Sequence, residues 1–164
     1  MGSEMCIRDS FNVLSAEEYG SLKDAISLIT IYIAAADGEI EEDETRWAEK
    51  VTKIRSYNLP EDLRGFYKDV GEDFSDKLEN LRTTLPKVEA ERLILLEEKL
   101  AALNPILAKL DRKLGAEMYK SFVTFAKHVA KASGGFLGFF SVGPKEAELI
   151  KLSMLDEIVY EEEA

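Results

Sequence analysis

Apolar residues recur at intervals of three and four along most of the chain, which is the period of an α-helix. The clearest run predicts a helix from Ser15 to about Gly38, opened by a capping box of Ser15 and Glu18 and ended by a turn at Gly38. Its apolar positions cover almost the whole circumference, which predicts a central helix: Leu22, Ile26, Leu28, Ile29, Ile31, Tyr32 and Ile33.

Similar spacing predicts further helices over residues 42–57, 61–70, 73–85, 86–103, 104–114, 116–132 and 144–159. Pro60, Gly71, Pro86 and Pro105 separate several of these segments. No segment shows the alternation of apolar and polar residues that a strand requires. The sequence therefore predicts an all-α fold, a compact bundle of about six to eight helices forming one domain over residues 11–159, followed by an acidic tail at 160–164.

Composition places the chain among soluble globular proteins, because 46% of its 164 residues are hydrophobic and 32% are charged. The net charge of −11 argues against nucleic acid and against an anionic membrane as partners, and favours cations or the basic surface of an unidentified protein. No apolar run reaches the roughly 18–20 residues that cross a bilayer, so we expect a cytoplasmic protein with no transmembrane segment.

Residues 1–10 are expected to be non-native or disordered. The stretch "MCIRDS", Met5 to Ser10, resembles one reading frame of a transposon end that is used to prepare sequencing libraries. The single cysteine, Cys6, lies in this stretch, which excludes a thiol nucleophile, a disulfide and a zinc–thiolate site from the domain. The same absence of cysteine fits a reducing compartment.

An acidic turn follows the first helix, in the stretch "AAADGEIEEDE" from Ala34 to Glu44. Carboxylates are the side chains that Mg²⁺ and Ca²⁺ prefer, and aligning Gly38 with the glycine of an EF-hand loop places Glu44 at the last ligand position. The first two ligand positions fall on Ile33 and Ala35, so a high-affinity EF-hand is excluded. The candidate ligands of a weak, largely hydrated Mg²⁺ or Ca²⁺ are Asp37, Glu41, Glu44 and Glu146.

The alternative for the acidic turn is structural. Acidic residues favour the positive end of a helix dipole, and Asp37 would then cap the next helix through its backbone N–H groups.

A glycine- and phenylalanine-rich loop spans Ser133 to Pro144, "SGGFLGFFSVGP". As an interaction loop it would dock on a protein partner through Phe136, Leu137, Phe139 and Phe140. The same side chains would alternatively fold back and fill the core, with the glycines permitting close approach. Membrane contact by this loop is the less favoured interpretation.

The two turns are related by a weak internal repeat. An offset of 96 residues aligns the helix before the acidic turn with the helix before the Gly/Phe loop, and past the loop the offset becomes 102. The repeat predicts two helix–turn–helix hairpins that pack about a pseudo-twofold axis. The aligned pairs include Ile26 with Phe122, Ile29 with Phe125, Ile33 with Val129, and Glu44 with Glu146.

The first turn resembles the signature of TerB (tellurite-resistance) domains, a helix that ends in Ala36-Asp37-Gly38, followed by Ile40 and by Glu44. The resemblance implies an all-helical fold with two such hairpins, a stress-response role and divalent-cation binding through the acidic turns. In the second turn Ser133 stands where the family has Asp, and only Glu146 of the acidic pattern is kept.

Catalysis is not indicated. No phosphate loop, dinucleotide fingerprint or Gly-x-Ser-x-Gly motif is present, and the single histidine, His128, has no cysteine or second histidine to work with in the domain. We expect a non-enzymatic TerB-like domain that binds a divalent cation at the Asp37–Glu44 turn, or alternatively a protein-interaction module that acts through the Gly/Phe loop.

Overall fold

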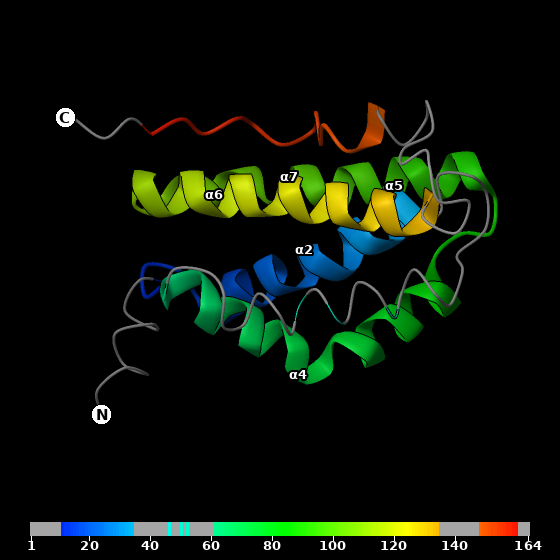
Figure 1. Ribbon diagram of the computed structural model, residues 1–164, viewed down its shortest axis with the longest axis horizontal. Coiled ribbons are helices and arrows are strands. Elements are labelled where there is room, and N and C mark those ends of the chain that lie inside the picture. The colour runs from blue at the N-terminus through cyan, green and yellow to red at the C-terminus, as the bar shows by residue number, and fades with distance from the viewer. Residues whose placement is uncertain are drawn as a thin grey trace.

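The computed structural model describes residues 11–34, 46, 50, 52, 61–134 and 148–160 (Figure 1). Its helices are α2 (Ala16–Ala34), α4 (Glu61–Thr84), α5 (Glu89–Ala101), α6 (Asn104–Lys109) and α7 (Arg112–Gly134). The described part of the chain contains no strand, so the all-α prediction is confirmed there. The predicted total of six to eight helices and the paired hairpins draw on segments outside these residues. Of the predicted helix 42–57, Arg46, Lys50 and Thr52 are described, and all three are helical.

Helix α2 is the central helix of the bundle. It packs against α4, α5 and α7, and lies between α4 and α7 in Figure 1. The predicted capping box opens it: the Ser15 N–H donates to Glu18 Oε1 at 2.9 Å, and the Glu18 N–H donates to Ser15 Oγ at 3.0 Å. Lys109 at the end of α6 also pairs with Glu18, and these contacts hold the pKa of that carboxyl below its usual value. The helix start is therefore fixed both locally and by α6.

The predicted pair of helices over 61–70 and 73–85 is present as the two halves of α4, and only the position of the break differs. The two halves join at a kink on Asp73, whose φ of −133° and ψ of 20° are not helical, two residues after the expected break at Gly71 (Figure 1). A glycine weakens a helix by about 1 kcal/mol, and here the helical geometry is lost two residues after Gly71. Val70 and Phe74 on either side are both buried.

Helix boundaries in the next region also differ from the prediction. Helix α5 begins at Glu89, because Val88 is extended and residues 86–87 do not join the helix. Helix α6 is a short piece with Pro105 in its first turn, and the break before α7 falls at Leu110 and Asp111. Gly115, which lies between the predicted helices 104–114 and 116–132, is inside the first turns of α7.

The predicted last helix, 144–159, is wrong over most of its described length. Only Glu148 and Leu149 are helical, and the carboxyl-terminal segment 148–160 then runs along α7 without regular structure (Figure 1). Leu152 adopts the left-handed conformation, with φ 46°. This segment bonds to other parts of the chain: Asn104 Nδ2 donates to the Met154 carbonyl at 2.9 Å, and the Arg112 Nε–H donates to the Val159 carbonyl at 2.8 Å. Such partners satisfy the backbone groups that a helix would otherwise pair internally.

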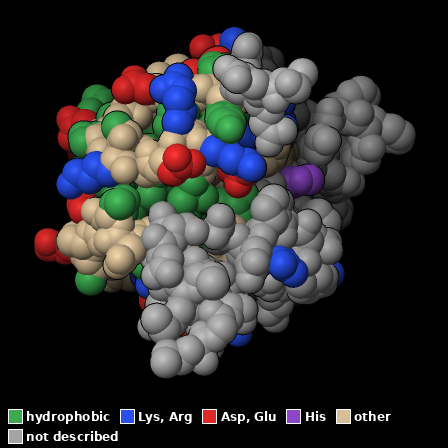
Figure 2. Space-filling model, turned by 90° about the vertical axis from the view of Figure 1, so that its left-hand side faces the viewer, with side chains coloured by type: hydrophobic (Ala, Val, Ile, Leu, Met, Phe, Trp, Pro, Cys, Tyr) green, Lys and Arg blue, Asp and Glu red, His purple; other side chains and the backbone are tan. Residues whose placement is uncertain are grey.

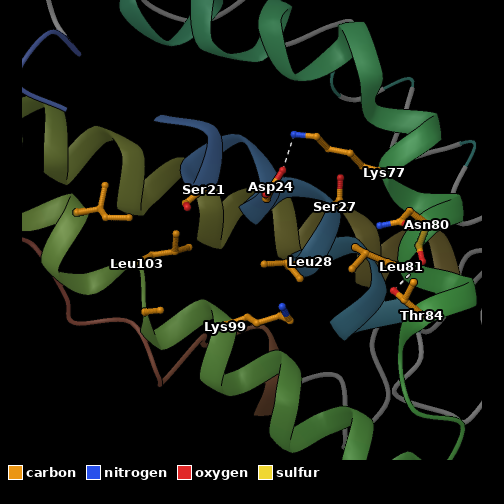
Figure 3. Close-up of a pocket in the computed structure, with 12 residues that line it drawn as sticks. Ser21, Asp24, Ser27, Leu28, Lys77, Asn80, Leu81, Thr84, Lys99 and Leu103 are labelled. Atoms are coloured by element: carbon orange, nitrogen blue, oxygen red, sulfur yellow. Dashed lines mark hydrogen bonds and ion pairs between the residues drawn. The ribbon is translucent and has the colours of Figure 1, made fainter. Parts of the chain in front are cut away.

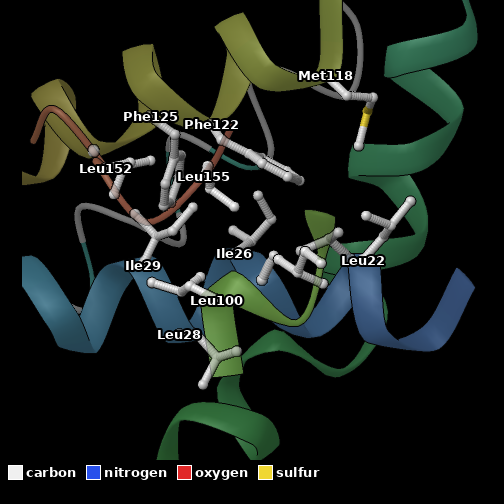
Figure 4. Close-up of a cluster of buried hydrophobic side chains, with 14 of the residues drawn as sticks. Leu22, Ile26, Leu28, Ile29, Leu100, Met118, Phe122, Phe125, Leu152 and Leu155 are labelled. Carbon is white, nitrogen blue, oxygen red and sulfur yellow. The ribbon is translucent and has the colours of Figure 1, made fainter. Parts of the chain in front are cut away.

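One hydrophobic core joins these elements (Figure 4). Ile26 and Ile29 of α2 meet Phe122 and Phe125 of α7, and the carboxyl-terminal segment adds Leu152 and Leu155. Phe11, before the first helix, is buried as well, so the core of the described residues reaches from Phe11 to Leu155. Among the described residues, no helix has the length and apolar character needed to span a membrane.

Two glycines in the first turns of helices are expected to respond differently to alanine. Gly20 of α2 has no atom within 4 Å of the position its Cβ would take, whereas a Cβ on Gly115 would lie 3.3 Å from the Leu107 carbonyl oxygen and 3.4 Å from Ile158 Cδ1. Gly20→Ala should raise the free energy of unfolding by about 0.5–1 kcal/mol, because alanine restricts the unfolded chain. Gly115→Ala should raise the free energy of unfolding by less than this amount, or lower it, because its Cβ would lie so close to the Leu107 carbonyl oxygen. Urea denaturation of both variants tests the contrast, and equal gains would contradict it.

Candidate functional site

The candidate site residues predicted from the sequence lie outside the described residues. These are the proposed cation ligands Asp37, Glu41, Glu44 and Glu146, and the interaction-loop residues Phe136, Leu137, Phe139 and Phe140. The structure does describe the helices that lead into both turns. Helix α7 continues through Gly134, so the first two residues assigned to the Gly/Phe loop are helical.

Helices α2 and α7 pack against each other and end at the same end of the bundle, on the right in Figure 1. The pairs that the internal repeat aligns on these helices, Ile26 with Phe122 and Ile29 with Phe125, are all fully buried in the shared core. The chain therefore leaves for the acidic turn and for the Gly/Phe loop from one end of the molecule. This end is the candidate functional site.

Described acidic residues add negative charge near the end of α2. Tyr32, two residues before that end, donates a hydrogen bond from its hydroxyl to Glu97 Oε2 of α5 at 2.7 Å. Burial raises the pKa of Tyr32 well above its usual range, and the hydrogen bond to Glu97 and the charges of Glu97 and Glu148 add to the increase. Tyr32 thus stays neutral, and Glu97 adds negative charge that attracts cations. Glu148 is paired with Lys151 at 3.3 Å, which offsets its charge at a distance.

The opposite end of the bundle has a different charge pattern. On the face shown in Figure 2, Lys and Arg side chains stand among the acidic ones. The ion pair between Lys109 and Glu18 lies at this end, where α2 begins. The opposite charges of this ion pair cancel at a distance.

No metal-binding group can be assembled from the described side chains alone. Across residues 11–34, 61–134 and 148–160, no three His, Cys, Asp or Glu side chains come together in a way that would hold an ion. His128 is exposed on α7, in the second half of the helix. A cation site at this end would have to use carboxylates of the acidic turn.

The structure also contains a cavity that sequence reasoning missed. It has a volume of about 500 Å³ and lies between α2, the second half of α4, and the α5–α6 region (Figure 3). One signal in the sequence could have indicated the cavity. Ser21, Asp24 and Ser27 recur every three residues and form a polar stripe on a helix that is largely apolar. The other lining residues come from helices far apart in the sequence, so the cavity as a whole could not be read from local spacing.

Comparison with known proteins finds no match to a family model, to a curated protein or to a solved structure.

Proposed function

We propose that the protein is a TerB-like helical domain that works by binding and not by catalysis, with a divalent cation held at its acidic turn. Asp37 and Glu44 would be the principal ligands, with Glu41 and Glu146 adding oxygens to a largely hydrated Mg²⁺ or Ca²⁺. Mg²⁺ keeps several waters when few carboxylates are available, which suits such a site.

The observation that carries this proposal is the common end of α2 and α7. A site made from both turns needs the two helices that precede them to finish close together, and the packed pair α2 and α7 meets this condition (Figure 1). Glu146 is two residues before Glu148, whose charge is felt by Tyr32 near the end of α2. Glu97 would strengthen the attraction for a cation without acting as a ligand.

A titration with Mg²⁺ and Ca²⁺, followed by thermal unfolding, tests the proposal. A cation that binds only the folded protein raises its stability by about 1.4 kcal/mol at ten times the Kd. Asp37→Asn should abolish this rise, since it removes a charged ligand. Asp76→Asn is the matched control, because Asp76 is an exposed acid of α4. Equal melting temperatures of the unchanged protein with and without cation would contradict the site. A cation-induced rise that Asp37→Asn and Asp76→Asn reduce by the same amount would also contradict it.

The Gly/Phe loop supports a second proposal, an interaction module that docks on a protein with a basic surface. It would begin where α7 ends, at the end of the bundle where α2 also ends. A partner with basic residues around an apolar patch would match Phe136, Leu137, Phe139 and Phe140 beside the acidic turn. A net charge of −11 disfavours nucleic acid for this role and favours a protein. Under either proposal we place the protein in the cytoplasm.

A further inference from the structure

We propose that the cavity between α2, α4 and the α5–α6 region binds a small amphipathic organic carboxylate, whose charged group pairs with Lys99 and whose hydrocarbon part contacts Leu28, Leu81 and Leu103. This site is separate from the acidic turn and does not depend on cation binding.

The size and origin of the cavity fit a small-molecule site. Its volume of about 500 Å³ lies within the range of roughly 300–1,000 Å³ that ligand pockets occupy. Helix α2 supplies the floor, and α4 and α5 supply walls that both pack on α2 (Figure 3). A ligand here would be held by side chains of the main helices.

Apolar side chains from three helices line the cavity together. Leu28 comes from α2, Leu81 from α4, and Leu103 and Ile106 from the α5–α6 region. Leu28 and Leu81 are both drawn toward the open space in Figure 3. Each buried methylene of a ligand gains about 0.8 kcal/mol from contact with such a surface, so a short hydrocarbon chain would be retained.

The charged lining residues favour a carboxylate over other head groups. Lys77 is already paired with Asp24, and its ammonium nitrogen also lies 3.7 Å from Asp73 Oδ2. Lys99, on the facing wall, forms no ion pair with any residue that the structure describes, so its charge is available. An amine would find only Asp24, which Lys77 occupies. Among the described residues that line the cavity there is no arginine, although arginine forks are the common ligands of phosphate groups.

Ser27 gives an independent indication that a polar ligand belongs here. Its side chain lines the cavity and is 1% exposed, and its hydroxyl oxygen has no hydrogen-bond partner among the described residues. Figure 3 shows this hydroxyl directed toward α4, on the side of Lys77. An unpaired buried hydroxyl destabilises a protein by about 1–3 kcal/mol, and a second polar atom of the ligand, on the side away from Lys99, would supply the missing partner.

Decanoate and decanol are the probes that test this proposal, by isothermal titration calorimetry on the full chain. Decanoate should bind about tenfold more tightly than decanol, the factor expected of one charge-assisted hydrogen bond. Lys99→Met should weaken decanoate binding by about the same factor and leave decanol binding unchanged. Lys120→Met, which removes an exposed lysine of α7 with the same change in net charge, should alter neither.

Three results would overturn the proposal. The first is no heat of binding for decanoate, which would show that the cavity takes no such ligand. The second is equal affinity for decanoate and decanol, which would show that the charge is not recognised. The third is an equal effect of Lys99→Met and Lys120→Met, which would place the carboxylate elsewhere. Circular dichroism of both variants establishes that they are folded, and Lys99 is exposed, so its replacement should be tolerated.

Discussion

Replacing Phe66 with alanine is expected to lower the free energy of unfolding by about 3–5 kcal/mol, the usual effect of deleting a fully buried aromatic ring. The ring of Phe66 is 0% exposed, and it joins four parts of the chain. Its centroid lies 5.9 Å from that of Phe11, 6.0 Å from Tyr19, 5.2 Å from Tyr67 and 6.4 Å from Phe122. Small domains are stable by only about 5–15 kcal/mol, so this variant should lose a large part of its stability.

Urea denaturation at equilibrium measures the change, and Ile94→Ala is the matched control. Ile94 is a large apolar residue of α5 that is 57% exposed, so its truncation should change the free energy of unfolding by less than about 0.5 kcal/mol. Phe66→Leu should fall between the two, because leucine fills part of the space. A loss for Phe66→Ala no larger than that of Ile94→Ala would contradict the assignment of Phe66 to the centre of the core.

Two buried serines should respond to alanine with opposite signs. Ser27 of α2 has an unpaired hydroxyl, so Ser27→Ala is expected to raise the free energy of unfolding by about 1 kcal/mol. Ser121 of α7 is buried too, but its Oγ accepts a hydrogen bond from the Tyr67 hydroxyl at 3.1 Å and donates one to the Met118 carbonyl at 2.8 Å. Ser121→Ala is expected to lower the free energy of unfolding by about 1–3 kcal/mol.

Ser27→Ala and Ser121→Ala serve as controls for each other, because both replace a buried serine of a helix with alanine. Thermal and urea unfolding of the ligand-free protein should agree in sign for each variant. A loss of stability in Ser27→Ala as large as that in Ser121→Ala would show that the Ser27 hydroxyl has a partner in the folded state. It would also remove one of the supports for the proposed ligand cavity.

The parts of the fold that follow from short-range interactions could be predicted from the sequence. The capping box needs only Ser15 and Glu18, and it is present as predicted. The helical spacing of Ile26 and Ile29, and of Phe122 and Phe125, identified the faces of α2 and α7 that meet in the core. Periodicity works at these positions because helix propensity and burial agree.

The parts that failed depend on residues distant in the sequence. Leu149, Leu152 and Leu155 have helical spacing, yet the backbone around them bonds to Asn104 and Arg112, about fifty residues earlier. The cavity likewise needs the second half of α4 to face α5 across α2, which local spacing does not specify. Cation binding by Asp37, Glu41, Glu44 and Glu146 stays a prediction, because these residues lie outside the described part of the chain.

The carboxyl-terminal segment 148–160 also constrains how the chain folds while it is being synthesised. Leu152 and Leu155 lie beside Phe122 and Phe125 and complete the core over α7 (Figure 4). A nascent chain that has formed α2 to α7 but still holds these leucines inside the ribosome leaves that apolar surface uncovered. Exposed apolar surface of this kind makes folding intermediates prone to aggregate. The last step of core formation therefore comes after the ribosome has released residue 155, late in the production of this domain.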